Sequence, residues 1–223
     1  MVDQLSATLT TLEDKLLPLH TVLLMVDMQN DFVSGEGKMA SFGFDVSMVQ
    51  QVVPTCREFL AEARKLSIFT VHTRVINDAA QNAPSWVAFW GPPAVTVEGT
   101  WGAQFYPGFE PLPDEMVITK YAYGAFDGTN LDSILRRRDI RTLVVAGTGG
   151  LICSGDTMHR GFALGYHIVA VEDCLADFTV QGPEWTRTVH DVGMYITARH
   201  YGHVVKAGDV LKIWKAQRKP RRR

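Results

Sequence analysis

The chain has 223 residues, of which 46% are hydrophobic and 21% are charged, and its formal net charge is −2. This composition is typical of one globular domain with a large core, and it excludes the overall basic field that binds nucleic acid. No apolar run approaches the roughly 20 residues that cross a bilayer, so we expect no membrane partner.

In chain order, the apolar pattern predicts strand Thr21–Val26, helix Ser47–Lys65, strand Ser67–His72, strand Met116–Thr119, helix Leu131–Arg138, strand Thr142–Ala146, helix Cys153–Leu164, strand Tyr166–Val171, helix Glu184–Arg199 and a short strand His203–Val205. Strands that alternate with helices pair in parallel through right-handed crossovers. The pattern therefore predicts an α/β fold, a three-layer α/β/α sandwich.

We expect one domain over residues 21–214, preceded by an N-terminal arm (1–20) and followed by a basic tail (215–223). Residues 77–114 lack periodicity but are rich in aromatic residues such as Trp86, Trp90 and Trp101. Loops of this length are usually functional or disordered, and the aromatic content argues against disorder. The segment is expected to cover an active site or to form a subunit interface, and the sequence does not choose between them.

The cysteines, Cys56, Cys153 and Cys174, form neither a disulfide framework nor a C-x-x-C pair. The residues after Met1 lack the pattern of a signal peptide. We therefore expect a cytoplasmic, reducing location.

Reactive side chains directly follow three of the predicted strands. Asp27 follows the first, Lys120 follows the third, and Cys153 follows a glycine-rich turn (147–150) and opens the next helix. Ligands of open parallel sheets bind outside the carboxyl ends of the strands. If these strands are neighbours, the three side chains meet at one edge of the sheet.

Such a meeting would suit acyl transfer. The helix N-terminus and a nearby lysine favour the Cys153 thiolate, and Asp27 can accept the thiol proton. A glycine-rich turn at a helix start presents N–H donors for an oxyanion. Each residue also has a structural interpretation: a buried cysteine in the core, an aspartate in a turn and a lysine at the surface.

The local sequences make the chemical interpretation more specific. The motifs are Leu-Met-Val-Asp-Met-Gln-Asn-Asp-Phe at 24–32, the stretch from Lys120 to Leu131 with its Ala-Phe pair, and the segment 147–157 followed by Gly-Tyr at 165–166. Over roughly residues 20 to 175 the chain resembles the isochorismatase-like cysteine hydrolases. This family includes N-carbamoylsarcosine amidase, nicotinamidase, and ureidoacrylate and biuret hydrolases.

The resemblance implies a six-stranded, mostly parallel Rossmann-like sheet, usually in a homo-oligomer (a dimer or tetramer). It implies Asp27 as general base, Lys120 as its partner and Cys153 as nucleophile, with no cofactor. It also implies a cis peptide bond between Thr148 and Gly149, and an oxyanion hole formed by the N–H groups of Gly149 and Cys153.

The chain departs from the family pattern in two places. Gly149 and Gly150 stand where relatives commonly have alanine and threonine, and Gly155 stands where they have a larger residue. The metal-binding Asp-x-His of the nicotinamidase branch is matched by Val75 and Asn77. We therefore expect no catalytic metal, and nicotinamide is disfavoured as the substrate.

The expected function is hydrolysis of an amide or ureido C–N bond in a small amide or N-carbamoyl compound. Arg74, Trp90 and Phe126 are candidate substrate-binding residues. The alternatives are an isochorismatase-type vinyl-ether hydrolase and a non-hydrolytic thiol protein. A dinucleotide site is disfavoured, because Ile152 occupies the last glycine position of G-x-G-x-x-G.

Overall fold

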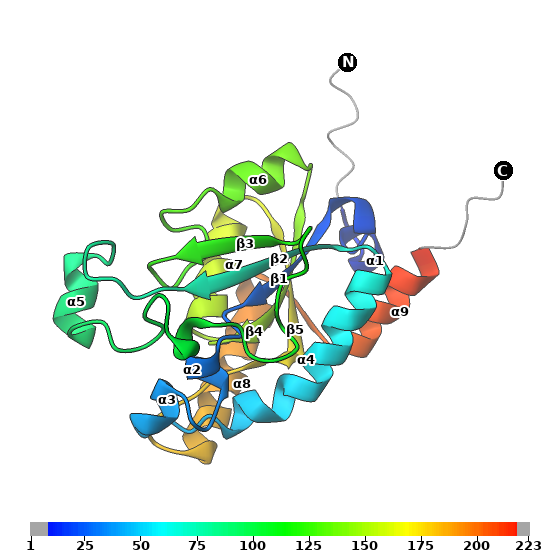
Figure 1. Ribbon diagram of the computed structural model, residues 1–223. Coiled ribbons are helices and arrows are strands. Elements are labelled where there is room, and N and C mark those ends of the chain that lie inside the picture. Colours follow the sequence, from blue (N-terminus) through cyan, green and yellow to red (C-terminus); the bar gives the residue numbers. More distant parts are fainter. Residues whose placement is uncertain (1–8, 218–223) are drawn as a thin grey trace.

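A six-stranded sheet forms the centre of the computed structural model, which describes residues 9–217 (Figure 1). The strands are β1 (Thr21–Val26), β2 (Phe69–Val75), β3 (Met116–Lys120), β4 (Thr142–Thr148), β5 (His167–Ala176) and β6 (Gly202–Val205). Their order is β3-β2-β1-β4-β5-β6, and every neighbouring pair is parallel. The predicted α/β fold is confirmed, with a wholly parallel sheet.

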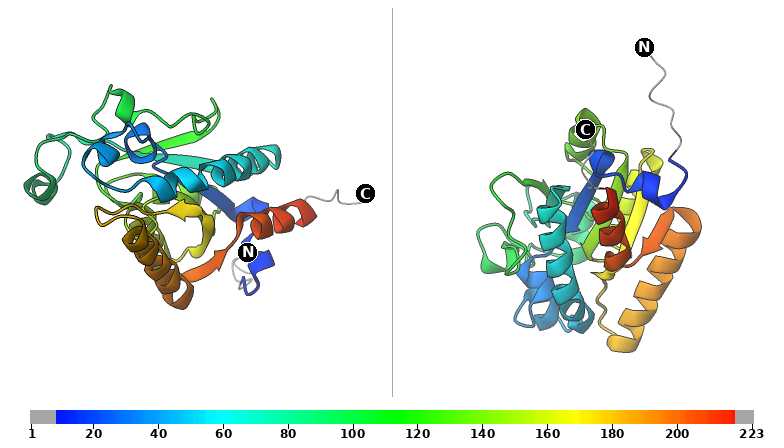
Figure 2. Two further views of the ribbon diagram at one scale, coloured as in Figure 1. Left: turned by 90° about the horizontal axis from the view of Figure 1, so that it is seen from below. Right: turned by 90° about the vertical axis from the view of Figure 1, so that its right-hand side faces the viewer.

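The helices are α1 (Leu12–Lys15), α2 (Asn30–Val33), α3 (Lys38–Ser41), α4 (Ser47–Lys65), α5 (Pro84–Trp90), α6 (Leu131–Arg137), α7 (Cys153–Ala163), α8 (Pro183–His200) and α9 (Ala207–Gln217), with 3-10 turns at Pro18–His20 and Trp101–Ala103. Helices α4 and α9 pack on one face of the sheet and α6 and α7 on the other (Figures 1 and 2). Within residues 9–217, no helix has both the length and the hydropathy to span a membrane.

Strand β1 is the centre of the sheet and is buried along its whole length. Leu23 and Met25 join the core under α4, whereas Val22, Leu24 and Val26 join the core under α6 and α7. A parallel strand covered on both faces has apolar side chains at every position, because both alternating sets are buried. This burial fixes the register of β1 and therefore the position of the residue that follows it.

The ends of the chain differ from the prediction. Leu16, in the expected arm, is fully buried in the core beside α4. The expected tail begins inside α9, where Lys215 forms an ion pair with Glu62. Helix α9 itself was not predicted, although Val210 and Trp214 recur at helical spacing and both are buried. Residues 1–8 of the arm and 218–223 of the tail lie outside the described residues.

Trp214 of α9 stacks on Phe59 of α4 at 5.5 Å between ring centroids, and both rings are buried. Trp214→Ala should lower the free energy of unfolding by about 3–5 kcal/mol, because it leaves a large cavity between the helices. Urea unfolding followed by circular dichroism measures this. Trp185→Ala is the control, since Trp185 is 59% exposed, and its effect should stay within about 0.5 kcal/mol. Equal losses in the two variants would contradict the role of α9 in the core.

Candidate active site

Asp27, Lys120 and Cys153 meet at the carboxyl edge of the sheet. In register, Val26 lies opposite both Thr73 of β2 and Gly147 of β4, and Val75 of β2 lies opposite Lys120. Nζ of Lys120 is 2.7 Å from Oδ2 of Asp27, and neither side chain is exposed. The fold thus brings together three residues that are far apart in sequence. Asp27 and Lys120 are separated by 93 positions, and Lys120 and Cys153 by 33.

Asp27 is held at both its backbone and its carboxylate. Its φ is +50°, in the left-handed region that aspartate adopts more readily than most residues. Its N–H donates to the Thr73 carbonyl at 3.2 Å, and Thr73 Oγ1 donates to Asp27 Oδ1 at 2.6 Å. Thr148 Oγ1 donates to the Asp27 carbonyl at 3.2 Å. Sequence reasoning missed Thr73, because a hydroxyl within a buried strand is the only sign of its role.

The residues that follow Asp27 hold the neighbouring loops in place through hydrogen bonds. The Gln29 side chain donates to the carbonyls of Val75 and Ala103, each at 3.0 Å. The carboxylate of Asp31 accepts the backbone N–H of Thr96 at 2.7 Å and that of Lys38 at 3.0 Å. The motif around Asp27 therefore supplies one reactive carboxylate and, beside it, the polar groups that hold surrounding segments in place.

Cys153 begins α7 and is buried beside this ion pair. Burial raises the pKa of its thiol, the charge of Lys120 lowers it, and the charge of Asp27 and a hydrogen bond with that carboxylate raise it further. The net direction is upward, so the resting thiol stays protonated. The helix terminus and the lysine were expected to favour the thiolate, with Asp27 as the proton acceptor. That expectation left out desolvation and the effect of the Asp27 charge on the pKa of the thiol.

Lys120 keeps its charge in this buried place. Burial lowers the pKa of the ammonium, but the charges of Asp27 and Cys153 and a hydrogen bond to Asp27 raise it, and the net direction is upward. Nζ also donates to the carbonyl of Ala122 at 3.1 Å. The cluster therefore holds a cation beside a carboxylate and a protonated thiol, which is the arrangement for moving a proton from sulfur to oxygen.

The glycine-rich turn before Cys153 corrects one expectation. Among the described residues no peptide bond is cis, so the expected cis bond between Thr148 and Gly149 is wrong for this structure. The turn is made instead by Gly149, whose φ is +64°. The Gly149 carbonyl accepts the N–H groups of Ile152 and Ser154 at 3.0 and 2.8 Å. These bonds join the turn to the start of α7.

Gly150, one of the expected departures from the family pattern, leaves no room for a side chain. A Cβ at this position would lie 2.6 Å from Oδ2 of Asp177. Asp177 is buried, and its other oxygen accepts the Leu151 N–H at 3.0 Å. The extra glycine therefore makes room for a carboxylate that holds the nucleophile turn.

Gly149 packs closely against the start of α7, because a Cβ at this position would be 2.9 Å from the backbone nitrogen of Cys153. The oxyanion hole of the Gly149 and Cys153 N–H groups stays a prediction.

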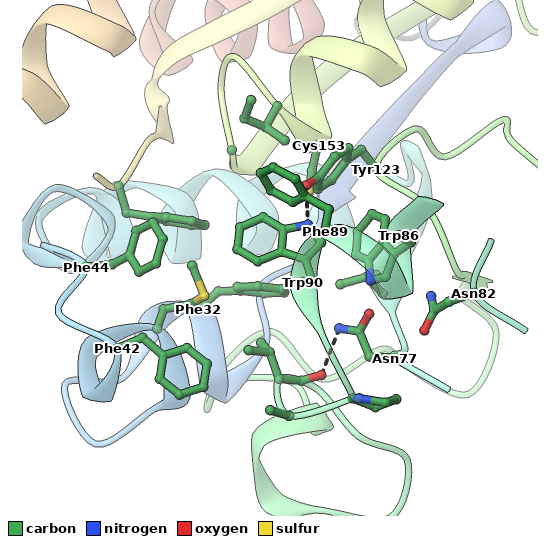
Figure 3. Close-up of a pocket in the computed structure, with 18 of the residues that line it drawn as sticks. Phe32, Phe42, Phe44, Asn77, Asn82, Trp86, Phe89, Trp90, Tyr123 and Cys153 are labelled. Atoms are coloured by element: carbon green, nitrogen blue, oxygen red, sulfur yellow. Dashed lines mark hydrogen bonds between the residues drawn. The ribbon is translucent and has the colours of Figure 1, made fainter. Parts of the chain in front are cut away.

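A cavity of about 430 Å³ reaches Cys153 and Gly149 (Figure 3). Residues 77–114, expected to cover an active site or to form a subunit interface, contribute much of its wall. They include helix α5, which stands at the edge of the molecule (Figures 1 and 2). Trp90 of α5 lines the cavity, and its Nε1 donates to the hydroxyl of Tyr123 at 2.7 Å. The helix was not predicted. Trp86, which also lines the cavity, belongs to the aromatic segment named in the sequence, whereas Tyr123 is a lining residue that sequence reasoning missed.

Two candidate substrate-binding residues lie elsewhere. Arg74 donates to Thr119 Oγ1 at 2.9 Å and lies 3.9 Å from Glu98, so its guanidinium is engaged beside the sheet edge. Phe126 stacks on Tyr166 at 5.8 Å between ring centroids and packs against the core under α7. Neither residue lines the cavity, so substrate contact stays a prediction for both.

The positions that match the nicotinamidase metal ligands take part in the cavity wall. Val75 and Asn77 both line it. The Asn77 side chain donates to the Val95 carbonyl at 2.8 Å, which ties the start of the long segment to its later part. In the described part of the chain, no three His, Cys, Asp or Glu side chains group as a metal site.

Known proteins share both sequence and fold with this chain. The isochorismatase domain model matches residues 21–191. Ureidoacrylate amidohydrolase RutB of Enterobacter sp. is 30% identical over 191 residues, which cover 76% of this chain and 80% of that protein. The RutB protein of Agrobacterium fabrum is 25% identical over 214 residues, covering 88% and 90% of the two chains.

Solved structures agree with this match. N-carbamoylsarcosine amidase from Thermoplasma acidophilum has a TM-score of 0.65 at 25% identity, covering 84% of this chain and 96% of that one. A cysteine hydrolase from Pseudomonas syringae pv. phaseolicola has a TM-score of 0.81 at 22% identity, covering 90% and 95%, and shows the same fold. The resemblance found in the sequence is confirmed by these comparisons.

The electrostatics of the cluster predict an unusual response to Asp27→Asn. The amide keeps the shape of the carboxylate but lacks the charge that raises the pKa of the Cys153 thiol, while Lys120 remains. The pH midpoint for alkylation of Cys153 by iodoacetamide should fall by about one unit or more. Peptide mass spectrometry across a pH series measures it. Asp191→Asn, at an exposed ion pair, should leave the midpoint unchanged, and an upward move in Asp27→Asn would contradict the argument.

Proposed function

Because the chain belongs to the isochorismatase family of hydrolases, we propose that it opens an amide or ureido C–N bond of a small molecule through a thioester on Cys153. The observation that carries this proposal is the buried ion pair of Asp27 and Lys120, 2.7 Å apart, beside a buried thiol at the cavity. The relatives named amidohydrolase and amidase support a C–N bond as the one that is cleaved.

The first half of the reaction makes the thioester. Asp27 takes the proton of the Cys153 thiol as the sulfur attacks the substrate carbonyl carbon. The C–S bond forms, and the carbonyl π electrons move to the oxygen, which accepts hydrogen bonds from the N–H groups of Gly149 and Cys153. An electron pair of the oxyanion then re-forms the C=O bond, and the C–N bond breaks with its electron pair going to nitrogen. The nitrogen takes the proton from Asp27 and leaves as ammonia, and the thioester remains.

The second half regenerates the enzyme. Asp27, again a carboxylate, takes a proton from a water molecule that attacks the thioester carbonyl. The C–S bond breaks, the sulfur receives the proton back, and the carboxylic acid leaves. Lys120 keeps its charge throughout and stabilises the carboxylate form of Asp27, while Thr73 holds one carboxylate oxygen at 2.6 Å. These two residues act through Asp27 and keep it oriented.

Ammonia release tests the hydrolase. Purified protein is incubated with primary amides, N-carbamoyl acids, biuret-like ureides and nicotinamide, beside Cys153→Ala. Turnover of the accepted class should fall by about 10³-fold or more in Cys153→Ala and in Asp27→Asn, because each removes a group required for the thioester. Cys56→Ala, which removes a buried thiol that does not line the cavity, should retain activity. Near-normal turnover by Cys153→Ala would refute the mechanism and favour the vinyl-ether reaction.

The thioester itself can be trapped. Hydroxylamine competes with water for an acyl-enzyme, so the wild-type protein should convert the accepted amide partly into a hydroxamate, detected by mass spectrometry. Cys153→Ala mixed with the same reagents supplies the non-enzymatic background. Hydrolysis without any hydroxamate at saturating hydroxylamine would point to direct attack by water.

A further inference from the structure

Aromatic rings from distant parts of the chain enclose the cavity. On one side Phe178, after β5, stacks on Phe32 of α2 at 6.0 Å between centroids, and Phe44 meets Phe178 edge-on at 5.8 Å. All three rings line the cavity, and Phe32 and Phe44 can be followed in Figure 3. Rings that pack on one another in this way hold a fixed surface, which suits a flat or bulky apolar group.

The other wall of the cavity contacts the segment that carries Lys120. Trp86 packs on Tyr123 at 4.6 Å between centroids, and Trp90 donates to the Tyr123 hydroxyl. Asn82 donates to the carbonyl of Tyr121 at 3.0 Å, which ties the approach to α5 to the same loop. The indole rings are therefore positioned against the loop that follows β3.

Charge is distributed unevenly around this cavity. Among the described residues, no Lys, Arg or His lines it, and the only charged lining residue is the carboxylate of Asp177. The nearest candidate cation from the sequence, Arg74, lies outside it, and Lys120 is already paired with Asp27. An anionic substrate would lose its water without gaining a cation from the lining. It would also face the carboxylate of Asp177, whose Oδ2 lies 3.6 Å from Nδ1 of the buried His190.

Resting on the proposed function, we propose that the preferred substrate is an uncharged amide or ureide whose acyl side carries an aromatic or similarly bulky apolar group. The cavity of about 430 Å³ falls within the range of roughly 300–1,000 Å³ of small-molecule sites. The relatives named for ureidoacrylate and N-carbamoylsarcosine take their names from compounds that carry a carboxylate. The substrate that we propose for this chain thus differs from those compounds in lacking a carboxylate.

The test compares three primary amides that share one backbone. In 3-phenylpropanamide, butanamide and succinamate, the chain after the second methylene ends in a phenyl ring, a methyl group or a carboxylate. Their dissociation constants are measured on Cys153→Ala by titration calorimetry, supported by the fluorescence of the indoles at the cavity. We expect 3-phenylpropanamide to bind at least 10-fold more tightly than butanamide, and succinamate more weakly than butanamide. Succinamate binding as tightly as butanamide, or no gain from the phenyl ring, would overturn the proposal.

A matched pair of variants adds a cation either at the cavity lining or outside it. In the Cys153→Ala background, Phe89→Arg places a cation at a cavity-lining ring that is 78% exposed, and Phe162→Arg places one at an exposed ring of α7 outside the lining. Succinamate should bind at least 5-fold more tightly to the first variant and with unchanged affinity to the second. If the affinity for succinamate rose equally in both variants, or did not rise in Phe89→Arg, the absence of a cation could not be the cause of weak succinamate binding.

These binding measurements are independent of turnover. If wild-type protein releases no ammonia from any amide while 3-phenylpropanamide binds in the expected order, the hydrolase proposal fails and the ligand class stands. If ammonia is released from succinamate in preference to 3-phenylpropanamide, the hydrolase stands and the ligand class fails.

Discussion

The buried pair of Asp27 and Lys120 is the interaction on which the rest of this structure depends. Removing two charges from water costs several kcal/mol per ion, and close contact with further hydrogen bonds must offset this. The pair meets that requirement at 2.7 Å, with Thr73 and the Ala122 carbonyl as additional partners. Such an arrangement requires three strand ends to arrive together, so the order and register of the sheet are conditions for its existence.

Placement of the thiol completes the argument from electrostatics to chemistry. A cysteine at a helix N-terminus beside a lysine would lose its proton easily in a more exposed site. Here burial and the charge of Asp27 outweigh these effects and raise the pKa of Cys153. In the mechanism that we propose, this carboxylate does more than support an existing thiolate. It accepts the proton when the sulfur attacks, so the nucleophile forms where a substrate carbonyl is present.

The sequence predicted the sheet because burial on both faces leaves an unambiguous apolar run, as in β1, and strand ends then located Asp27, Lys120 and Cys153. It did not predict α9, whose helical spacing of Val210 and Trp214 follows the last strand closely. It also did not indicate that Arg74 and Phe126 would lie outside the cavity lining. Both residues follow or adjoin site motifs in the chain. The direction of their side chains, however, depends on contacts with Thr119, Glu98 and Tyr166, which form only in the folded protein.

Helix α5 shows a further limit of sequence reasoning and a link between fold and specificity. None of its residues is buried, so no apolar face directed toward a core could have predicted it. Its position comes instead from polar ties on either side, through Asn77, Asn82 and the contact of Asp31 with Thr96. The motif that carries the reactive Asp27 thus also fixes, four residues later, the segment that closes the cavity. Reactivity and the shape of the binding site are therefore set by the same short stretch of chain.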